Sequence, residues 1–193
     1  LKLSPAEHLS HIKQTSDYAL SKNFTVNLYL EDWSSGMRDS RDYLFMMMDE
    51  LVKLPIKRFL LPDTLGILNP LQCVEYMRQM VRRYPNSHFD FHAHNDYDLA
   101  VSNSLAAVLS GAKGLHVTVN GLGERCGNAP LASVQVILKD MFGAKTNIKE
   151  DRLNDISRLV EGYSGIAVAP NTPVVGDHVC HQVAGRIADG DNT

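Results

Sequence analysis

The sequence predicts an α/β fold, namely the C-terminal half of a TIM-type (β/α)8 barrel followed by the start of a linker and subdomain. The first observation is that four strand–helix units follow one another along the 193 residues, which is typical of parallel strands with right-handed crossovers. The second is that three of the four strands keep a polar face, whereas the central strands of a doubly wound sheet are apolar on both faces. Polar side chains that point at a common centre favour a barrel with a reaction chamber in its upper interior.

Four units make only half of a barrel, and half a barrel has two unpaired strand edges. The chain opens with Leu1, without an initiator methionine or a signal peptide, and its first helix begins almost at once. We therefore expect the missing strands to precede Leu1. We also expect residues 1–143 to form a partial catalytic barrel, and residues 144–193 to form a linker and the start of a C-terminal subdomain.

Five helices are predicted from apolar residues that recur every three to four positions. In chain order they cover residues 5–22, 40–52, 70–83, 98–110 and 128–142. Ser4 caps the first helix, Asp39 or Ser40 opens the second, and Asn69 precedes a proline at the start of the third. Gly143 follows the fifth helix, where a glycine commonly ends a helix.

Four strands are predicted between these helices, at residues 24–31, 57–62, 88–94 and 114–120. In the first, third and fourth, polar and apolar residues alternate, so the polar ones share one face of the sheet. The three polar faces consist of Asn27, Tyr29 and Glu31; His88, Asp90, His92 and His94; and His116, Thr118 and Asn120.

The composition describes an ordinary globular protein, with 44% hydrophobic residues and a net charge of −3. The absence of a basic excess argues against nucleic acid as a partner, and the apolar runs are too short to cross a membrane. The three cysteines, Cys73, Cys126 and Cys180, form no C-x-x-C pair. This pattern argues against a disulfide framework or a structural zinc site and favours the reducing cytoplasm.

The most informative stretch reads Phe91-His92-Ala93-His94-Asn95-Asp96. Side chains two apart on a strand point the same way, so His92 and His94 present two imidazoles to one point. Two such histidines near a strand end predict a divalent-metal site. The alternative is a pair of strand histidines held by ordinary hydrogen bonds.

The other strand ends carry polar residues too, and in such barrels the reacting groups lie there. These ends read Glu31-Asp32, Asp63-Thr64 and, after the last strand, the loop 120–128. Asp32 and Asp63 have the alternative of only capping the next helix. The glycines of the loop form either an ordinary turn or a backbone cradle for phosphate at a helix N-terminus.

Residues 88–134 resemble the signature of the metal-dependent acyl-CoA condensing barrels, the family of 2-isopropylmalate, homocitrate and citramalate synthases with the related hydroxymethylglutaryl-CoA lyases. The pattern H-x-H-N-D-x-x-x-A-x-x-N-x-L matches residues 92–105, and N-G-x-G-E-R-x-G-N matches residues 120–128. Tyr-Leu-Glu-Asp-Trp-Ser at residues 29–34 makes the likeness closest to citramalate synthase.

The resemblance implies roles for six residues. His92 and His94 are the implied metal ligands, with Asn128 as a further neighbour of the metal. Thr64 is implied to hydrogen-bond the carboxylate of a 2-oxo acid, and Glu31 to act as the catalytic residue beside the reacting carbons. Tyr29 is implied to shrink the acceptor pocket toward pyruvate, with simple filling of the barrel as the alternative.

The implied reaction condenses acetyl-CoA with a 2-oxo acid, as in citramalate synthase with pyruvate, in leucine and isoleucine biosynthesis. A divalent metal (Zn, Mn, Mg or Co) acts as Lewis acid on the carbonyl, and the full-length protein is implied to be a homodimer. The alternatives are a 2-isopropylmalate synthase with 2-oxoisovalerate as acceptor, an acyl-CoA lyase or aldolase, and a degenerate, non-catalytic paralogue.

Two features depart from the family pattern. The family's remaining metal ligand is an Asp in an Arg-Asp-Gly motif, and no such motif occurs in this chain. Residues 184–190 read Ala-Gly-Arg-Ile-Ala-Asp-Gly, so Ile187 stands where the family has a proton-transferring histidine. Either another group substitutes for that histidine, or this copy is weakened. We therefore expect the isolated 193-residue chain to be inactive.

Overall fold

The computed structural model describes residues 3–181 and contains one sheet of four parallel strands. In chain order the strands are β1 (Asn27–Tyr29), β2 (Arg58–Asp63), β3 (Phe89–Ala93) and β4 (Gly114–His116), and this is also their order in the sheet. The helices are α1 (Pro5–Ser21), α2 (Trp33–Asp39), α3 (Arg41–Leu51), α4 (Pro70–Arg83), α5 (Ala100–Leu109), α6 (Leu131–Phe142) and α7 (Leu153–Ser164). The predicted alternation of parallel strands and helices is confirmed.

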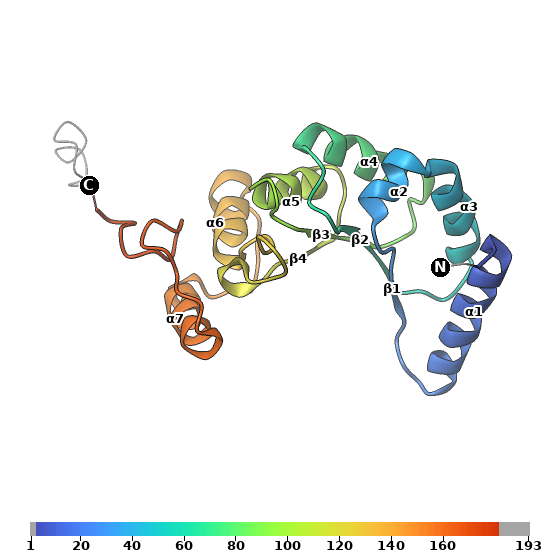
Figure 1. Cartoon of the computed structure of the whole chain (residues 1–193), viewed down its shortest axis with the longest axis horizontal. Coiled ribbons are helices and arrows are strands. Elements are labelled where there is room, and N and C mark those ends of the chain that lie inside the picture. Colours follow the sequence, from blue (N-terminus) through green and yellow to red (C-terminus); the bar gives the residue numbers. More distant parts are fainter. Residues whose placement is uncertain (1–2, 182–193) are drawn as a thin grey trace.

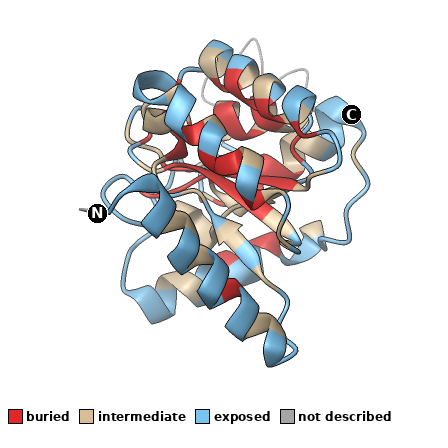
Figure 2. Ribbon diagram, turned by 90° about the vertical axis from the view of Figure 1, so that its right-hand side faces the viewer, coloured by how far each residue is buried: buried red, intermediate tan, exposed pale blue. Residues whose placement is uncertain are grey.

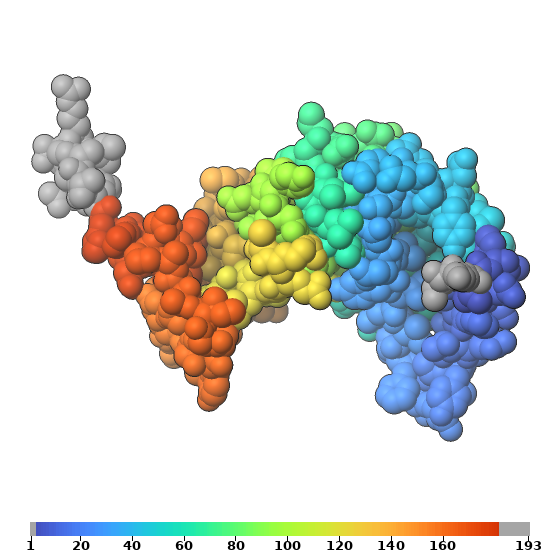
Figure 3. All heavy atoms as spheres, in the orientation of Figure 1, coloured from blue at the N-terminus to red at the C-terminus, as the bar shows by residue number. Residues whose placement is uncertain are grey.

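The sheet is curved, and helices α2 to α6 cover its outer face (Figure 1). Its other face lies toward a hollow between the N-terminal segment and α7 (Figure 3). The longest pairing joins β2 to β3, with Phe59 opposite Phe89 and Asp63 opposite Ala93. This register brings the C-terminal ends of the two central strands to the same level, where loops can meet.

The core lies between the sheet and the outer helices, where Figure 2 shows the buried residues gathered. Phe89, Phe91 and Ala93 of β3 are at most 1% exposed. Trp33 of α2 packs edge-on against Phe91, with ring centroids 6.3 Å apart. Because burial of one such side chain contributes about 1.5–3 kcal/mol, the outer face holds the sheet together. The alternate residues of β3 are thereby turned inward, as predicted.

Two helix starts show why local sequence predicts these elements. The Ser4 hydroxyl accepts from the backbone N–H of Glu7, whose carboxylate accepts from the backbone of Ser4 in turn. Asn69 and Gln72 make the same reciprocal pair at the start of α4. Each pair satisfies donors that a helix terminus leaves without partners, so both predicted starts are confirmed.

Some boundaries differ from the prediction. The outer strands β1 and β4 have three residues each, shorter than the segments 24–31 and 114–120, because each pairs on one side only in this chain. Helix α2 was not predicted, since Trp-Ser-Ser-Gly is a poor helix-forming sequence; burial of its Trp33 and Met37 stabilises it instead. Helix α6 begins at Leu131 rather than at residue 128.

Helix α7 packs against α6 through Leu153 and Ala132, and it is also hydrogen-bonded to one residue of the loop after β4. The Asn120 amide donates to the Ser157 carbonyl oxygen at 2.9 Å, and the Ser157 hydroxyl donates back to the Asn120 side chain at 2.6 Å. Asn120 has a φ of 58°, so it ends the predicted strand in a turn. We retain as a proposal that residues 1–143 and 144–193 are separate units of organisation. Within residues 3–181 no helix combines the length and apolarity needed to cross a membrane.

Candidate metal and substrate site

The two histidines of the H-x-H motif lie side by side at the end of β3. Their ring centroids are 5.0 Å apart, and the ring planes are inclined at 79°. His94 follows the last residue of the strand and forms an isolated antiparallel bridge with Asn128. The sequence predicted that His92, His94 and Asn128 would meet, and the fold brings their backbones together at one strand end.

Three polar atoms in this group have no hydrogen-bond partner within residues 3–181. They are Nδ1 of His92, Nδ1 of His94 and Oδ1 of Asn128, and all three are buried. Buried polar atoms are nearly always paired, so these three atoms are open to a ligand that the protein itself does not supply. Imidazole nitrogen and amide oxygen are suitable donors to a divalent metal, so these residues fit such an ion. Among the described residues, no group of three or more His, Cys, Asp or Glu side chains is arranged so that it could hold a metal ion by itself.

The protonation state of His92 also suits metal binding. Burial, followed by the neighbouring imidazoles of His94 and His116, lowers the pKa of His92 to about 4, although the Glu31 carboxylate acts in the opposite direction. At neutral pH the ring is therefore uncharged and keeps the lone pair that a metal ligand requires. The structure thus holds His92 in its ligating form.

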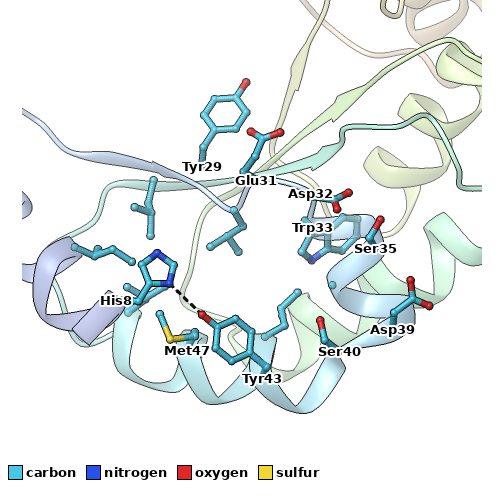
Figure 4. A pocket seen from close by; sticks show the side chains of 16 residues that line it. His8, Tyr29, Glu31, Asp32, Trp33, Ser35, Asp39, Ser40, Tyr43 and Met47 are labelled. Carbon is cyan, nitrogen blue, oxygen red and sulfur yellow. Dashed lines mark hydrogen bonds between the residues drawn. The ribbon is translucent and has the colours of Figure 1, made fainter. Parts of the chain in front are cut away.

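Glu31 and Thr64 form a pair across the ends of β1 and β2. The Thr64 hydroxyl donates to Oε1 of Glu31 at 2.8 Å and accepts from the backbone N–H of Asp32 at 3.0 Å. A hydroxyl has one proton, so Thr64 donates either to Glu31 or to a substrate carboxylate. Figure 4 shows Glu31 and Tyr29 pointing to the same side of β1, away from His8 and Tyr43.

Tyr29 lies between the histidines of two strands. Its ring meets His92 edge-on with centroids 6.4 Å apart, and its hydroxyl is 2.8 Å from Nδ1 of His116. Partial burial, followed by the negative charges of Glu31 and Asp90, raises the pKa of Tyr29. The phenol is therefore neutral at physiological pH. The predicted position of Tyr29 one residue pair below Glu31 places it beside the candidate metal ligand.

Arg125 connects three of the loops that follow the strands. Its guanidinium donates to both carboxylate oxygens of Asp96, at 2.7 and 2.8 Å, and to the Thr64 carbonyl oxygen at 2.8 Å. These bonds hold the pKa of Asp96 below its usual range. Gly66 has a φ of 59°, and a Cβ there would lie 2.7 Å from the Asp96 carboxylate. The loops after β2, β3 and β4 are thus packed as one unit.

The glycines of the loop 120–128 allow the chain to fold closely around Asn128. A Cβ on Gly123 would collide with the Asn128 amide, and one on Gly127 would collide with the Gly121 carbonyl. The Asn128 Nδ2 group donates to the Leu122 carbonyl oxygen at 3.1 Å, which orients the amide. These contacts favour the turn interpretation of the loop, because the space above the glycines is filled by the loop itself.

The strand-end aspartates also have defined surroundings. Asp63 is fully buried and accepts from the backbone N–H groups of Ile67 and Leu68 at 3.0 and 3.1 Å. Burial raises the pKa of Asp63 despite these bonds. Asp63 therefore shapes the loop after β2 rather than facing the site. Asp32 precedes α2 but makes no capping hydrogen bond.

A cavity of about 500 Å³ lies beside β1, between α1, α2 and α3 (Figure 4). Tyr29 and Glu31 belong to its lining, whereas His92, His94 and Asn128 do not. The candidate site is therefore on the inner face of the sheet.

Three residues of the candidate site were not predicted as site residues, namely Asp90, His116 and Arg125. The first two stood on the predicted polar faces, and the third stood in the matched loop motif. Ile187 lies outside the described residues.

Comparisons with known proteins identify the family of the chain. A family model described as HMGL-like matches residues 1–160. A homocitrate synthase of Saccharolobus islandicus is 40% identical over 184 residues, covering 95% of this chain and 39% of that protein. The "Putative (R)-citramalate synthase CimA" of Methanopyrus kandleri is 35% identical over 193 residues, covering 98% of this chain and 37% of that protein. The chain therefore spans about two fifths of the length of the curated relatives it matches.

Among solved structures, the HMG-CoA lyase of Bacillus subtilis superposes with a TM-score of 0.75 at 24% identity, covering 86% of this chain and 58% of that one. This likeness concerns the fold, and it confirms that the four strand–helix units form part of a TIM barrel. The match over residues 1–160, together with the curated relatives, shows that the chain belongs to the HMGL-like family.

Proposed function

We propose that the protein condenses acetyl-CoA with a 2-oxo acid, with pyruvate as the preferred acceptor, as a citramalate synthase does. The observation that carries the proposal is the group of three buried, unpaired donor atoms on His92, His94 and Asn128. The names of the relatives support a condensing synthase. The preference for pyruvate rests on Tyr29, whose ring occupies space beside His92.

In this proposal each residue has one task. His92, His94 and Asn128 hold a divalent ion (Zn, Mn, Mg or Co), which polarises the carbonyl of the oxo acid when it is bound. Thr64 donates to the carboxylate of the oxo acid, and Glu31 is thereby released from its hydrogen bond to Thr64. Glu31 then orients the reacting carbons, while Tyr29 limits the side chain of the acceptor.

Several further features belong to the proposal. A homodimer in the cytoplasm, a place in branched-chain amino-acid biosynthesis and the inactivity of the isolated 193-residue chain are all expected from the family resemblance. The second candidate is a 2-isopropylmalate synthase with 2-oxoisovalerate as acceptor. The described residues favour pyruvate over this candidate because Tyr29 takes up volume that a branched side chain needs.

The test is an assay of the protein expressed from its complete reading frame. Purified protein with Mn²⁺ or Zn²⁺ and acetyl-CoA is given pyruvate, 2-oxoisovalerate or 2-oxoglutarate, and the release of free CoA thiol is followed. Thiol release that is fastest with pyruvate is the expected result. Fastest release with 2-oxoisovalerate supports the second candidate. If no acceptor causes release although the metal is bound, the protein is a lyase or a non-catalytic paralogue, and the proposal is wrong.

A further inference from the structure

A buried carboxylate lies below the candidate metal ligands on the inner face of β3. Asp90 is 2% exposed and stands two residues before His92. Its Oδ1 atom lies 2.8 Å from Nε2 of His88, and its Oδ2 atom lies 3.3 Å from Nη1 of Arg58. A side chain at position 114 would collide with this carboxylate, so Gly114 makes room for it. A buried charge with this many partners is held in one place.

The third partner of Asp90 leads directly to Tyr29. Oδ2 of Asp90 is 3.5 Å from Nε2 of His116, and Nδ1 of the same ring is 2.8 Å from the Tyr29 hydroxyl. In the tautomer that carries the ring proton on Nε2, on the side of the carboxylate, Nδ1 keeps its lone pair and accepts the phenolic proton. Carboxylate, imidazole and phenol thus form one connected line from β3 through β4 to β1.

This series of contacts ends at Tyr29, the residue that limits the side chain of the 2-oxo acid in the proposed function. The Tyr29 ring meets His92 edge-on and His116 at a centroid distance of 5.8 Å. Tyr29 has 47% of its surface exposed in this chain, and its hydroxyl is hydrogen-bonded to His116. A Tyr29 ring without a fixed position would not discriminate between the methyl group of pyruvate and the branched side chain of 2-oxoisovalerate. The hydrogen bond from its hydroxyl is the contact that keeps the ring in position.

We propose that Asp90 and His116 are positioning residues that hold the Tyr29 ring against His92 and so determine the size of the acceptor. This inference rests on the proposed function and names the part of the site that selects the substrate. Asp90 orients His116, His116 holds the hydroxyl of Tyr29, and the ring of Tyr29 excludes side chains larger than the methyl group of pyruvate. His88 holds the other carboxylate oxygen of Asp90, whereas Arg58 shares Oδ2 with His116.

The test compares variants by their preference for pyruvate over 2-oxoisovalerate, measured as the ratio of kcat/KM values. His116→Ala lowers this ratio by about tenfold, the usual size of a discrimination based on one or two methylene groups. His116→Asn restores most of the ratio, because its amide oxygen can accept from the phenol. Tyr29→Phe removes only the hydroxyl and lowers the ratio as His116→Ala does. An unchanged ratio in both His116→Ala and Tyr29→Phe overturns the inference.

A double variant separates positioning from a general effect on the fold. Adding His116→Ala to Tyr29→Phe produces no further change in the ratio, because the hydrogen bond is already absent. If the two changes multiply, His116 acts on selectivity by another route and the inference is wrong. His11→Ala is the control, since this histidine is exposed on α1, outside the strands that carry Asp90, His116 and Tyr29, and it leaves the ratio within about twofold of wild type.

A binding measurement keeps this test independent of turnover. Calorimetric titration of the metal-loaded protein with pyruvate and with 2-oxoisovalerate, without acetyl-CoA, gives a ratio of dissociation constants. We expect His116→Ala to shift this ratio toward 2-oxoisovalerate. If that shift is found but no condensation is observed, the proposed reaction is wrong and the inference about His116 is supported. Equal loss of affinity for both acids shows a merely structural role for His116 and overturns the inference.

Discussion

Arg125 binds both carboxylate oxygens of Asp96, with Nε 2.7 Å from Oδ1 and Nη2 2.8 Å from Oδ2. The same Nη2 group donates to the carbonyl oxygen of Thr64 at 2.8 Å. One guanidinium therefore joins the loops after β2, β3 and β4, which carry the proposed substrate and metal residues. Only a planar, forked donor makes this set of bonds.

Replacing Arg125 by lysine tests whether this arrangement matters for turnover. Lysine keeps the charge but not the two parallel hydrogen bonds, so Thr64 and Asn128 lose their fixed spacing. We expect kcat/KM to fall by about tenfold while the free energy of unfolding stays close to that of wild type, because the ion pair is solvent-exposed. The CoA-thiol assay and urea unfolding measure the two quantities. Arg152→Lys, in an exposed pair with Asp155, is the control. Unchanged turnover in Arg125→Lys contradicts the prediction.

Thr64 provides a second prediction, because its hydroxyl is shared between Glu31 and the substrate in our proposal. Thr64→Val keeps the shape of the side chain and removes the proton, and we expect kcat/KM to fall by about ten- to a hundredfold, the value of a hydrogen bond to a charged group. Thr64→Ser keeps the hydroxyl and retains activity near that of wild type. Steady-state kinetics with varied oxo acid distinguishes them. Equal activity of the valine and serine variants would exclude a role for the hydroxyl.

Tyr29→Ala removes the whole ring that limits the acceptor side chain, and not only the hydrogen bond of its hydroxyl to His116. The preference for pyruvate over larger 2-oxo acids should fall by about ten- to a hundredfold, since the cavity then admits several additional methylene groups. Competition between pyruvate and 2-oxoisovalerate, with the products separated by chromatography, measures the preference directly. A preference that stays at the wild-type value assigns Tyr29 to filling of the barrel and removes it from substrate selection.

Gly127→Ala tests the loop that holds Asn128. The residue has a φ of 86°, and a Cβ there would collide with the Gly121 carbonyl, so the loop must open. We expect a loss of about 1–3 kcal/mol in the free energy of unfolding, together with weaker metal binding. Gly143→Ala is the matched control. It also has a positive φ, but nothing lies within 4 Å of its Cβ position. It should lose only about 1 kcal/mol and leave metal binding unchanged. Equal metal affinity in both variants contradicts the role of the loop.

The parts of this site that depend on local periodicity were predictable from the sequence. His92 and His94 face one point because a strand repeats every two residues, and Ser4 and Asn69 cap helices because their side chains reach the N–H groups of the first turn. The same alternation directs Phe89 and Phe91 to the outer face of the sheet, where they pack against the helices in the core. These features need no knowledge of distant contacts.

The contacts that complete the site depend on the tertiary structure. Tyr29 and His116 are 87 residues apart, and Arg125 and Asp96 are 29 apart, so no local pattern pairs them. Helix α2 was missed for a related reason, since its Ser-Ser-Gly sequence disfavours a helix and it is stabilised by the burial of Trp33 and Met37. The proposed roles of Asp90 and His116 depend on the curvature of the sheet, which brings side chains of β1, β3 and β4 into contact.

The central claim is that His92 and His94 bind one divalent ion, and a metal titration tests it most directly. Mn²⁺, Zn²⁺ or Co²⁺ is titrated into the metal-free protein, expressed from its complete reading frame. The wild type is compared with the His92→Ala and His94→Ala variants, with the double variant that carries both substitutions, and with His178→Ala. We predict that each of the first two substitutions weakens binding by at least about a hundredfold, as expected for loss of a direct ligand. His178→Ala, far along the chain and exposed, should bind like wild type. Wild-type affinity in the variant that lacks both His92 and His94 would contradict the account.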